Sequence, residues 1–251
     1  MSHSRKDGSP EPETRPPEDH FQEIYRTRAS DYHRMISAED VDGHILPALQ
    51  SATVLGGQYV LDIGSGTGRI PLLIGGAPSF VVALDISFAM LAENRRQRRL
   101  AKGRWDLVQA DMVKLPIGSG LFDLVIAGWA IGHQTSWHRD TWRLNVASIL
   151  EEMERAAKPA GKVIILETLG TGATSPAPPT PELADYYWWL EGSQGFERTE
   201  IKTDYLFPSL EEAVAGTNFF FGDPLTEKIL ENDWQRLPEW TGMWSKTVRS
   251  Q

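Results

Sequence analysis

The middle of the chain alternates short apolar runs with longer amphipathic stretches. The runs are rich in Val, Ile, Leu and Phe, and each has the length of a buried strand. They span 59–63, 80–84, 105–110, 122–127 and 162–167. Helical stretches start near 67 and span 87–102 and 142–157, and Pro159 and Gly161 end the last of them. Strands that alternate with helices in this way predict an α/β fold with a mostly parallel sheet.

The segments that flank this core differ from it. Residues 1–19 are rich in Ser, Pro, Glu and Arg and hold almost nothing apolar, which predicts a disordered tail. Residues 20–50 contain two amphipathic stretches, and we expect them to form a helical lid. We therefore expect one domain over 20–251, with its core at 58–168 and the final strands within 169–251.

The last segment contains most of the aromatic residues. A Gly/Pro/Thr loop at 170–181 precedes a predicted helix over 182–191. Two β-leaning stretches follow, near 196–207 and 240–248, with a helix between them. We expect most of these aromatic side chains to pack in the core, including Phe219, Phe220 and Phe221. The aromatic run at 186–189 is a second candidate lid, and ordinary helix packing is its alternative role.

The composition excludes several classes of chemistry. The 251 residues include no cysteine, which rules out disulfides, thiolate metal sites, iron–sulfur clusters and cysteine nucleophiles, and we expect no metal. The apolar runs are far shorter than the roughly 18 residues of a membrane span. The N-terminus lacks the apolar core of a signal peptide. We therefore expect a cytoplasmic protein that does not contact a membrane.

The charge of the chain argues against a nucleic-acid partner. The net charge is -9, whereas phosphate binding needs a concentrated basic face. One dense basic run falls late in a predicted helix, where cations complement the helix dipole. Its residues are Arg95, Arg96, Arg98, Arg99 and Lys102. We therefore expect a small-molecule partner, and the sequence leaves the oligomeric state open.

The most informative motif is the turn that follows the first predicted strand, Val60-Leu-Asp-Ile-Gly-Ser-Gly-Thr-Gly68. Glycines at alternate positions let a ligand approach the backbone closely. Asp62 precedes the first of them by two residues, where a carboxylate repels a pyrophosphate but not an ammonium group. Asp85 follows the second strand, where a carboxylate can accept both hydroxyls of a ribose. Asp111 follows the third strand, where it can accept from an adenine amino group.

Together with Phe122-Asp-Leu-Val125 and the helix and turn over 152–161, these motifs resemble those of class I S-adenosylmethionine-dependent methyltransferases. The resemblance covers about 60–167, with Ala160 where a glycine is usual in the last turn. It implies a three-layer α/β sandwich around a seven-stranded, mostly parallel sheet whose last strand is antiparallel. It also implies that the core at 58–168 binds the cofactor S-adenosylmethionine, and that the segment at 169–251 lies on the substrate side.

The resemblance further implies a role for each motif residue. Asp62 and the turn backbone would hold the methionine end, Asp85 the ribose and Asp111 the adenine amine. The cofactor-binding residues implied are Asp62, Gly64, Ser65, Gly66, Gly68, Asp85, Ile86, Asp111, Met112 and Gly128. Helix capping or a surface turn is the alternative role for the three aspartates.

We expect the methyl acceptor beyond the fourth strand, because ligands bind at the carboxyl ends of the strands in open α/β sheets. His133 is the predicted catalytic base for a hydroxyl or protonated amine, since its unperturbed pKa of about 6.5 suits proton removal near neutrality. A structural role in the loop at 128–134 is its alternative. The other predicted substrate and lid residues are Tyr25, Arg28, Tyr32 and Trp129.

The sequence thus predicts an enzyme that methylates oxygen or nitrogen of an unidentified small molecule. Aromatic lid residues could hold a cationic amine or stack on a planar acceptor. Two other functions stay open at this point. One is a catalytically inactive cofactor-binding module, and the other is an NAD-type oxidoreductase, against which Asp62 and the glycine spacing argue.

Overall fold

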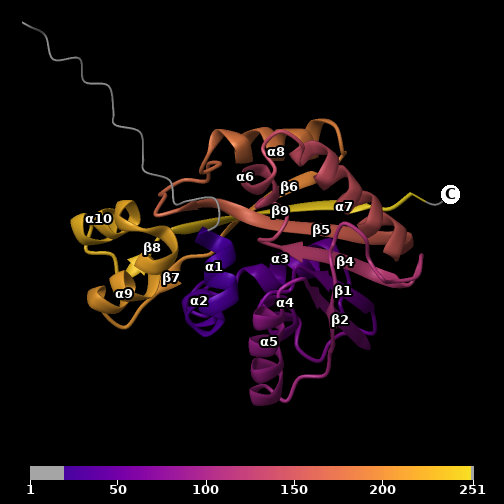
Figure 1. Ribbon diagram of the computed structural model, residues 1–251, viewed down its shortest axis with the longest axis horizontal. Helices are drawn as coiled ribbons and strands as arrows, with labels where there is room; N and C mark the ends of the chain where they lie inside the picture. Colours follow the sequence, from indigo (N-terminus) through magenta and orange to yellow (C-terminus); the bar gives the residue numbers. More distant parts are fainter. Residues whose placement is uncertain (1–19, 250–251) are drawn as a thin grey trace, which may run out of the picture.

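A seven-stranded sheet crosses the middle of the molecule, with helices on both of its faces (Figure 1). The computed structural model describes residues 20–249, so the tail predicted over 1–19 lies outside the described residues. The strands of this sheet are β1 (Tyr59–Ile63), β2 (Phe80–Asp85), β3 (Asp106–Gln109), β4 (Phe122–Gly128), β5 (Ala157–Thr171), β6 (Glu197–Lys202) and β9 (Glu239–Thr247).

The strand order is β3-β2-β1-β4-β5-β9-β6. Strands β1 to β5 are parallel, whereas β9 pairs antiparallel with both β5 and β6. The prediction of a seven-stranded, mostly parallel sheet with an antiparallel last strand is therefore confirmed. The carboxyl ends of β1, β2 and β4 meet at one edge, where a ligand site is expected in such a sheet.

Alternate residues of each central strand enter two separate cores. Leu61 and Ile63 pack with helices α7 (Trp142–Ala156) and α8 (Pro181–Gly192) on one face. Val60 packs with α3 (Ile45–Ala52) and α4 (Arg69–Ile74) on the other. Because both faces are covered, the strands read as continuous apolar runs. Helices α5 (Phe88–Leu100) and α6 (Gln134–Trp137) complete the layers.

A smaller third core lies beside this sandwich. It joins α2 (Ala29–Ile36) to the helices α9 (Leu210–Phe221) and α10 (Asp223–Glu231) and to the two-stranded sheet of β7 (Tyr205–Leu206) and β8 (Arg236–Leu237). The N-terminal helix α1 (His20–Thr27) lies between this unit and the sheet (Figure 1). We call α1, α2, α9, α10, β7 and β8 the cap.

Several boundaries differ from the prediction. Helix α4 begins at Arg69 rather than near 67, because the glycine turn continues to Gly68 at a φ of 92°. Strand β5 runs over Ala157–Thr171, well beyond the apolar run, because its pairing with β9 continues past Glu167. Two helices, not one, separate the β-leaning stretches of the last segment. Within residues 20–249, no helix has the length and apolarity to cross a membrane.

Candidate active site

A cavity of about 490 Å³ opens at the carboxyl ends of β1, β2 and β4. It brings together thirteen of the predicted site residues. They are Tyr25, Tyr32, Asp62, Gly64, Ser65, Gly66, Asp85, Ile86, Asp111, Met112, Gly128, Trp129 and His133. The loops after β1, β2 and β4 thus meet with the cap helices α1 and α2 around a single site.

The glycine turn leaves room that any side chain would fill. Gly64 and Gly66 have φ angles of 63° and 51°, which L-residues rarely adopt. A Cβ at Gly64 would lie 2.5 Å from the Cβ of Ala130 and 3.1 Å from the Cε of Met112. The predicted cofactor-binding residue Gly68 lies outside the cavity. It precedes α4, and a Cβ there would lie 2.7 Å from Oδ1 of Asn94, so a glycine lets the turn enter the helix at this position.

Asp62 is fully buried, and neither of its carboxylate oxygens has a hydrogen-bond partner among the described residues. Burial raises the pKa of this carboxyl well above its usual range, and the charge of Asp85 adds to the rise. A buried carboxylate without a partner is costly, so these oxygens suit a cationic ligand group. A cationic group in the cavity would supply the missing partner.

Asp85 is held rigidly at the end of β2. Its Oδ2 accepts from the backbone N–H of Gly66 and its Oδ1 from that of Ser87, both at 2.8 Å. Burial raises the pKa of Asp85, while these N–H groups oppose the rise. Beyond β3, Asp111 is exposed and accepts from the backbone N–H of Val113 at 3.0 Å. Both carboxylates are oriented before any ligand arrives.

Tyr25, Tyr32, Trp129, His133 and Trp137 line the other side of the cavity, and we call them the aromatic wall. Nε2 of His133 and the hydroxyl oxygen of Tyr25 share a hydrogen bond of 2.8 Å. The imidazole also stacks on Trp137, with ring centroids 4.7 Å apart, and Tyr25 contacts Tyr32 edge to face. Burial lowers the pKa of His133 to about 4 and raises that of Tyr32 to about 12. These groups are therefore neutral near pH 7.

The structure places the other aromatic runs in packing positions, the role that the sequence favoured for most of them. Phe219, Phe220 and Phe221 are only partly buried and pack against the cap core, with the Phe220 ring 5.5 Å from that of Tyr32. They support the cap because α9 packs on α2. The run at 186–189 does not line the cavity. On α8, Tyr186, Tyr187 and Trp189 pack on the core beneath the helix, whereas Trp188 is exposed.

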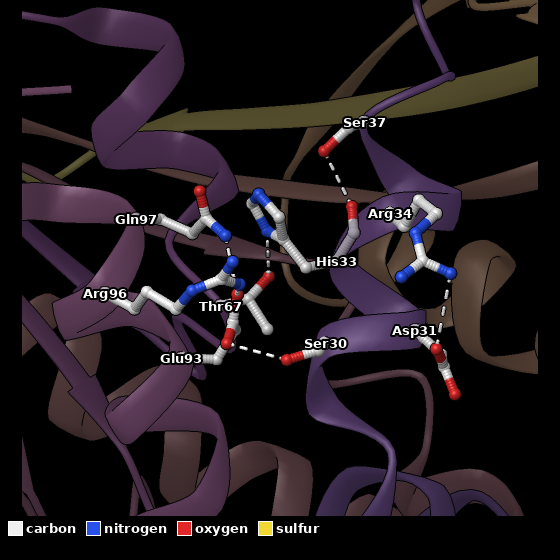
Figure 2. A network of polar contacts seen from close by, with 9 residues as sticks. All are labelled: Ser30, Asp31, His33, Arg34, Ser37, Thr67, Glu93, Arg96 and Gln97. Carbon is white, nitrogen blue, oxygen red and sulfur yellow. Dashed lines mark hydrogen bonds and ion pairs between the residues drawn. The ribbon is translucent and has the colours of Figure 1, made fainter. Parts of the chain in front are cut away.

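The cap is tied directly to the glycine turn, as Figure 2 shows. Nδ1 of His33 on α2 contacts the Thr67 hydroxyl at 2.9 Å, and Ser30 donates to Glu93 of α5 at 2.8 Å. The predicted lid residue Arg28 lies outside the cavity. It pairs with Asp31 at 2.9 Å and lies over the Phe219 ring.

Sequence reasoning missed Glu167, which contacts the loop that carries His133. This buried residue of β5 accepts from the backbone N–H of Gly132 at 2.7 Å, beside His133. Burial raises its pKa to about 8. An acidic residue at the end of an apolar run was the available signal, because a charged group there must find a partner.

Comparisons with known proteins agree with this geometry. Residues 61–165 match a family model described as a methyltransferase domain. That segment holds the glycine turn, Asp85 and the strands that carry them. The chain contains a class I S-adenosylmethionine-dependent methyltransferase domain. The match favours the methyltransferase prediction over the oxidoreductase alternative.

This chain aligns with only part of each relative's sequence. The chain is 37% identical over 118 residues to the ubiquinone/menaquinone biosynthesis C-methyltransferase UbiE of Coxiella burnetii, covering 44% of this chain and 43% of that protein. It is 30% identical over 151 residues to the malonyl-[acyl-carrier protein] O-methyltransferase of Legionella pneumophila, covering 58% and 48%. The chain thus spans about half the length of these relatives.

A solved structure extends the likeness of fold to most of the chain. A Haemonchus contortus phosphoethanolamine N-methyltransferase, in complex with phosphomonomethylethanolamine and S-adenosylhomocysteine, superimposes with a TM-score of 0.57 at 18% identity. The superposition covers 93% of this chain and 59% of that one. At this identity the likeness concerns the fold alone.

The residues present fit S-adenosylmethionine. The unpartnered carboxylate of Asp62 suits an ammonium group, and the side-chain-free turn admits a ligand against the backbone. Asp85 and Asp111 line the same cavity and provide acceptors for hydroxyl and amine donors.

Proposed function

We propose that the chain transfers the methyl group of S-adenosylmethionine to oxygen or nitrogen of a small-molecule acceptor. The observation that carries this proposal is the buried, unpartnered carboxylate of Asp62 beside a glycine turn. It suits the ammonium of a methionine group and would repel a pyrophosphate. The similar proteins act, by their names, on carbon in one case and on oxygen in another, so the acceptor atom must be read from the product.

Each of the cofactor's polar groups has a candidate partner in the cavity. Asp62 would bind the ammonium, Asp85 the ribose hydroxyls and Asp111 the adenine amine, with Ile86 and Met112 against the ring. When bound, S-adenosylmethionine supplies a methyl group already activated by a positive sulfur. Alignment of the acceptor then provides most of the rate enhancement.

The aromatic wall supports a role in orienting and deprotonating the acceptor. Tyr25, Tyr32 and Trp129 offer flat apolar surfaces and two hydroxyl groups. His133 is neutral near pH 7, so it can take a proton from a hydroxyl acceptor, directly or through Tyr25. The predicted lid over 20–50 would exclude water from this reaction, since α1 and α2 contribute to the cavity.

Isotope transfer tests the proposal. The full chain would be incubated with methyl-labelled S-adenosylmethionine and a metabolite extract, and labelled products would be identified by mass. We expect one labelled small molecule and an equal amount of S-adenosylhomocysteine, with no transfer by the Asp62→Ala variant. Calorimetric binding of S-adenosylhomocysteine without transfer to any fraction would indicate an inactive module and overturn the proposed activity.

A further inference from the structure

The cap contacts the glycine turn on both sides of Gly68. On one side, Nδ1 of His33 on α2 shares a hydrogen bond of 2.9 Å with the hydroxyl oxygen of Thr67. On the other side, Oε2 of Glu39, just beyond α2, accepts from Nη1 of Arg69 at 2.8 Å. Thr67 is buried, and the side chains of Glu39 and Arg69 are only 4% and 16% exposed. We call these two hydrogen bonds the anchor contacts.

The anchor contacts join two units that are packed separately. Among the described residues, the buried apolar cluster of the cap shares no member with the two clusters of the sandwich. Glu39 belongs to the cap, because the preceding residue, Ala38, accepts from the N–H of Leu206 on β7 at 2.9 Å. Its partner Arg69 begins α4 of the sandwich. The anchor contacts can therefore break without opening either core.

Asp62, the proposed partner of the cofactor's ammonium group, has no solvent-exposed surface. A ligand group can therefore reach it only after part of the cavity wall has moved. The glycine turn is fixed by the main chain of the sheet, since the N–H of Ser65 donates to the carbonyl of Leu84 at 2.9 Å. Helices α1 and α2, which contribute Tyr25 and Tyr32 to the cavity, are instead held to the sandwich by side-chain hydrogen bonds. These helices are the part of the wall that can move.

We infer that His33 and Glu39 are gating residues, whose anchor contacts must break before S-adenosylmethionine enters the cavity or S-adenosylhomocysteine leaves it. The inference rests on the proposed function, because it assumes that cofactor. Neither His33 nor Glu39 lines the cavity, so both contacts are compatible with a bound ligand. Weakening them destabilises the closed cap equally with and without ligand. Ligand exchange should then become faster in both directions, while the affinity changes little.

Stopped-flow binding of S-adenosylhomocysteine tests the inference without any acceptor. Tryptophan fluorescence can report binding, since Trp129 and Trp137 line the cavity. The observed rate constant of the wild-type protein should level off as the ligand concentration rises, because cap opening becomes rate-limiting. A rate constant that rises linearly over the whole range would overturn the inference, and this measurement depends on no variant. If calorimetry shows no binding to wild type at all, the proposed function fails as well, so the two failures are distinguishable.

Two variants each weaken one anchor contact. Glu39→Gln removes the charge of the ion pair, and His33→Ala removes the hydrogen bond to Thr67. Glu39→Gln should raise both the plateau rate and the dissociation rate about tenfold, and His33→Ala about fivefold, as expected for a charged and a neutral hydrogen bond. The equilibrium affinity of both variants should stay within about threefold of wild type.

Arg34→Gln is the matched control on the same helix. Figure 2 shows Arg34 and its partner Asp31 on the side of α2 away from Thr67, and the Arg34 side chain is 80% exposed. Its exchange rates should equal those of wild type. A purely structural role of His33 and Glu39 would weaken affinity or stability without accelerating association. The inference is wrong if folded Glu39→Gln and His33→Ala exchange the ligand at wild-type rates.

Discussion

The Tyr25 hydroxyl and the His133 imidazole share a hydrogen bond of 2.8 Å, although 108 positions separate them in the sequence. The bond joins α1 of the cap to the loop after β4, so it forms where the cap meets the sheet. Burial lowers the pKa of His133 to about 4 and raises that of Tyr25 well above its usual value, with the nearby Tyr32 adding to the rise. Both groups therefore enter the reaction uncharged.

The first prediction concerns this pair as the proton acceptor of the reaction. Once an acceptor is known, His133→Gln should lower the single-turnover rate by about 10²–10⁴-fold for a hydroxyl acceptor, the range of general base catalysis. Tyr25→Phe should lower it less, because the imidazole stays. Affinity for S-adenosylhomocysteine should stay within a few-fold of wild type in both variants. Unchanged rates in both variants would contradict a role in proton transfer.

The pH dependence of the single-turnover rate is a second test of the Tyr25–His133 pair. Since the pKa of His133 is about 4, its contribution to the rate should be constant from pH 8 to about 5 and fall only as the imidazole becomes protonated below that. A histidine with an ordinary pKa would already lose activity between pH 7 and 6. Single-turnover rates measured from pH 4.5 to 8 distinguish these two profiles.

Asp85 carries the second prediction. Asp85→Ala removes the ribose partner and also leaves the N–H of Gly66 without its acceptor, so S-adenosylhomocysteine should bind at least tenfold more weakly by calorimetry. Asp85→Asn keeps one carboxamide oxygen, so its affinity should lie between those of wild type and Asp85→Ala. Asp106→Ala is the matched control, because that carboxylate is exposed and lies outside the cavity. Wild-type affinity in Asp85→Ala would contradict the assigned role.

The sequence was most informative where a contact is local. Asp62 and Asp85 could be predicted because each lies at the end of a strand that reads as an apolar run. The Tyr25–His133 and Glu39–Arg69 contacts could not, since each joins residues at least 30 positions apart through the packing of the cap. The two-residue strands β7 and β8 are too short to leave a periodic signal.

The third prediction is that nucleic acids bind only weakly. The net charge is -9, and the basic run on α5 is partly neutralised, because Arg96 pairs with Glu93. Filter binding of duplex DNA or tRNA should therefore show weak association that is lost as salt rises. Methylation of purified tRNA at physiological salt would contradict this prediction and the small-molecule acceptor with it.

The fourth prediction concerns Glu167 and the pH dependence of folding. Burial raises its pKa from 4.5 to about 8, so the folded protein keeps a proton that the unfolded chain releases between these values. The free energy of unfolding should therefore fall as pH rises through this interval, by about 1.4 kcal/mol per unit from this group. Glu167→Gln cannot ionise, and its carbonyl oxygen can still accept the N–H of Gly132.

Urea unfolding at pH 5 and pH 8 measures the difference between the two proteins. Because other buried carboxyls titrate in both, only the gap between the wild-type and Glu167→Gln curves reports on this residue. We expect similar stability at pH 5 and a gain of about 4 kcal/mol for Glu167→Gln at pH 8, three pH units at the same slope. Glu151→Gln, at an exposed site on α7, should instead follow wild type at both pH values. Parallel curves for wild type and Glu167→Gln would mean that Glu167 is already ionised in the folded protein. In that case the N–H groups of the loop beside His133 would hold a carboxylate rather than a neutral acid, and Glu167 would place a negative charge beneath the aromatic wall.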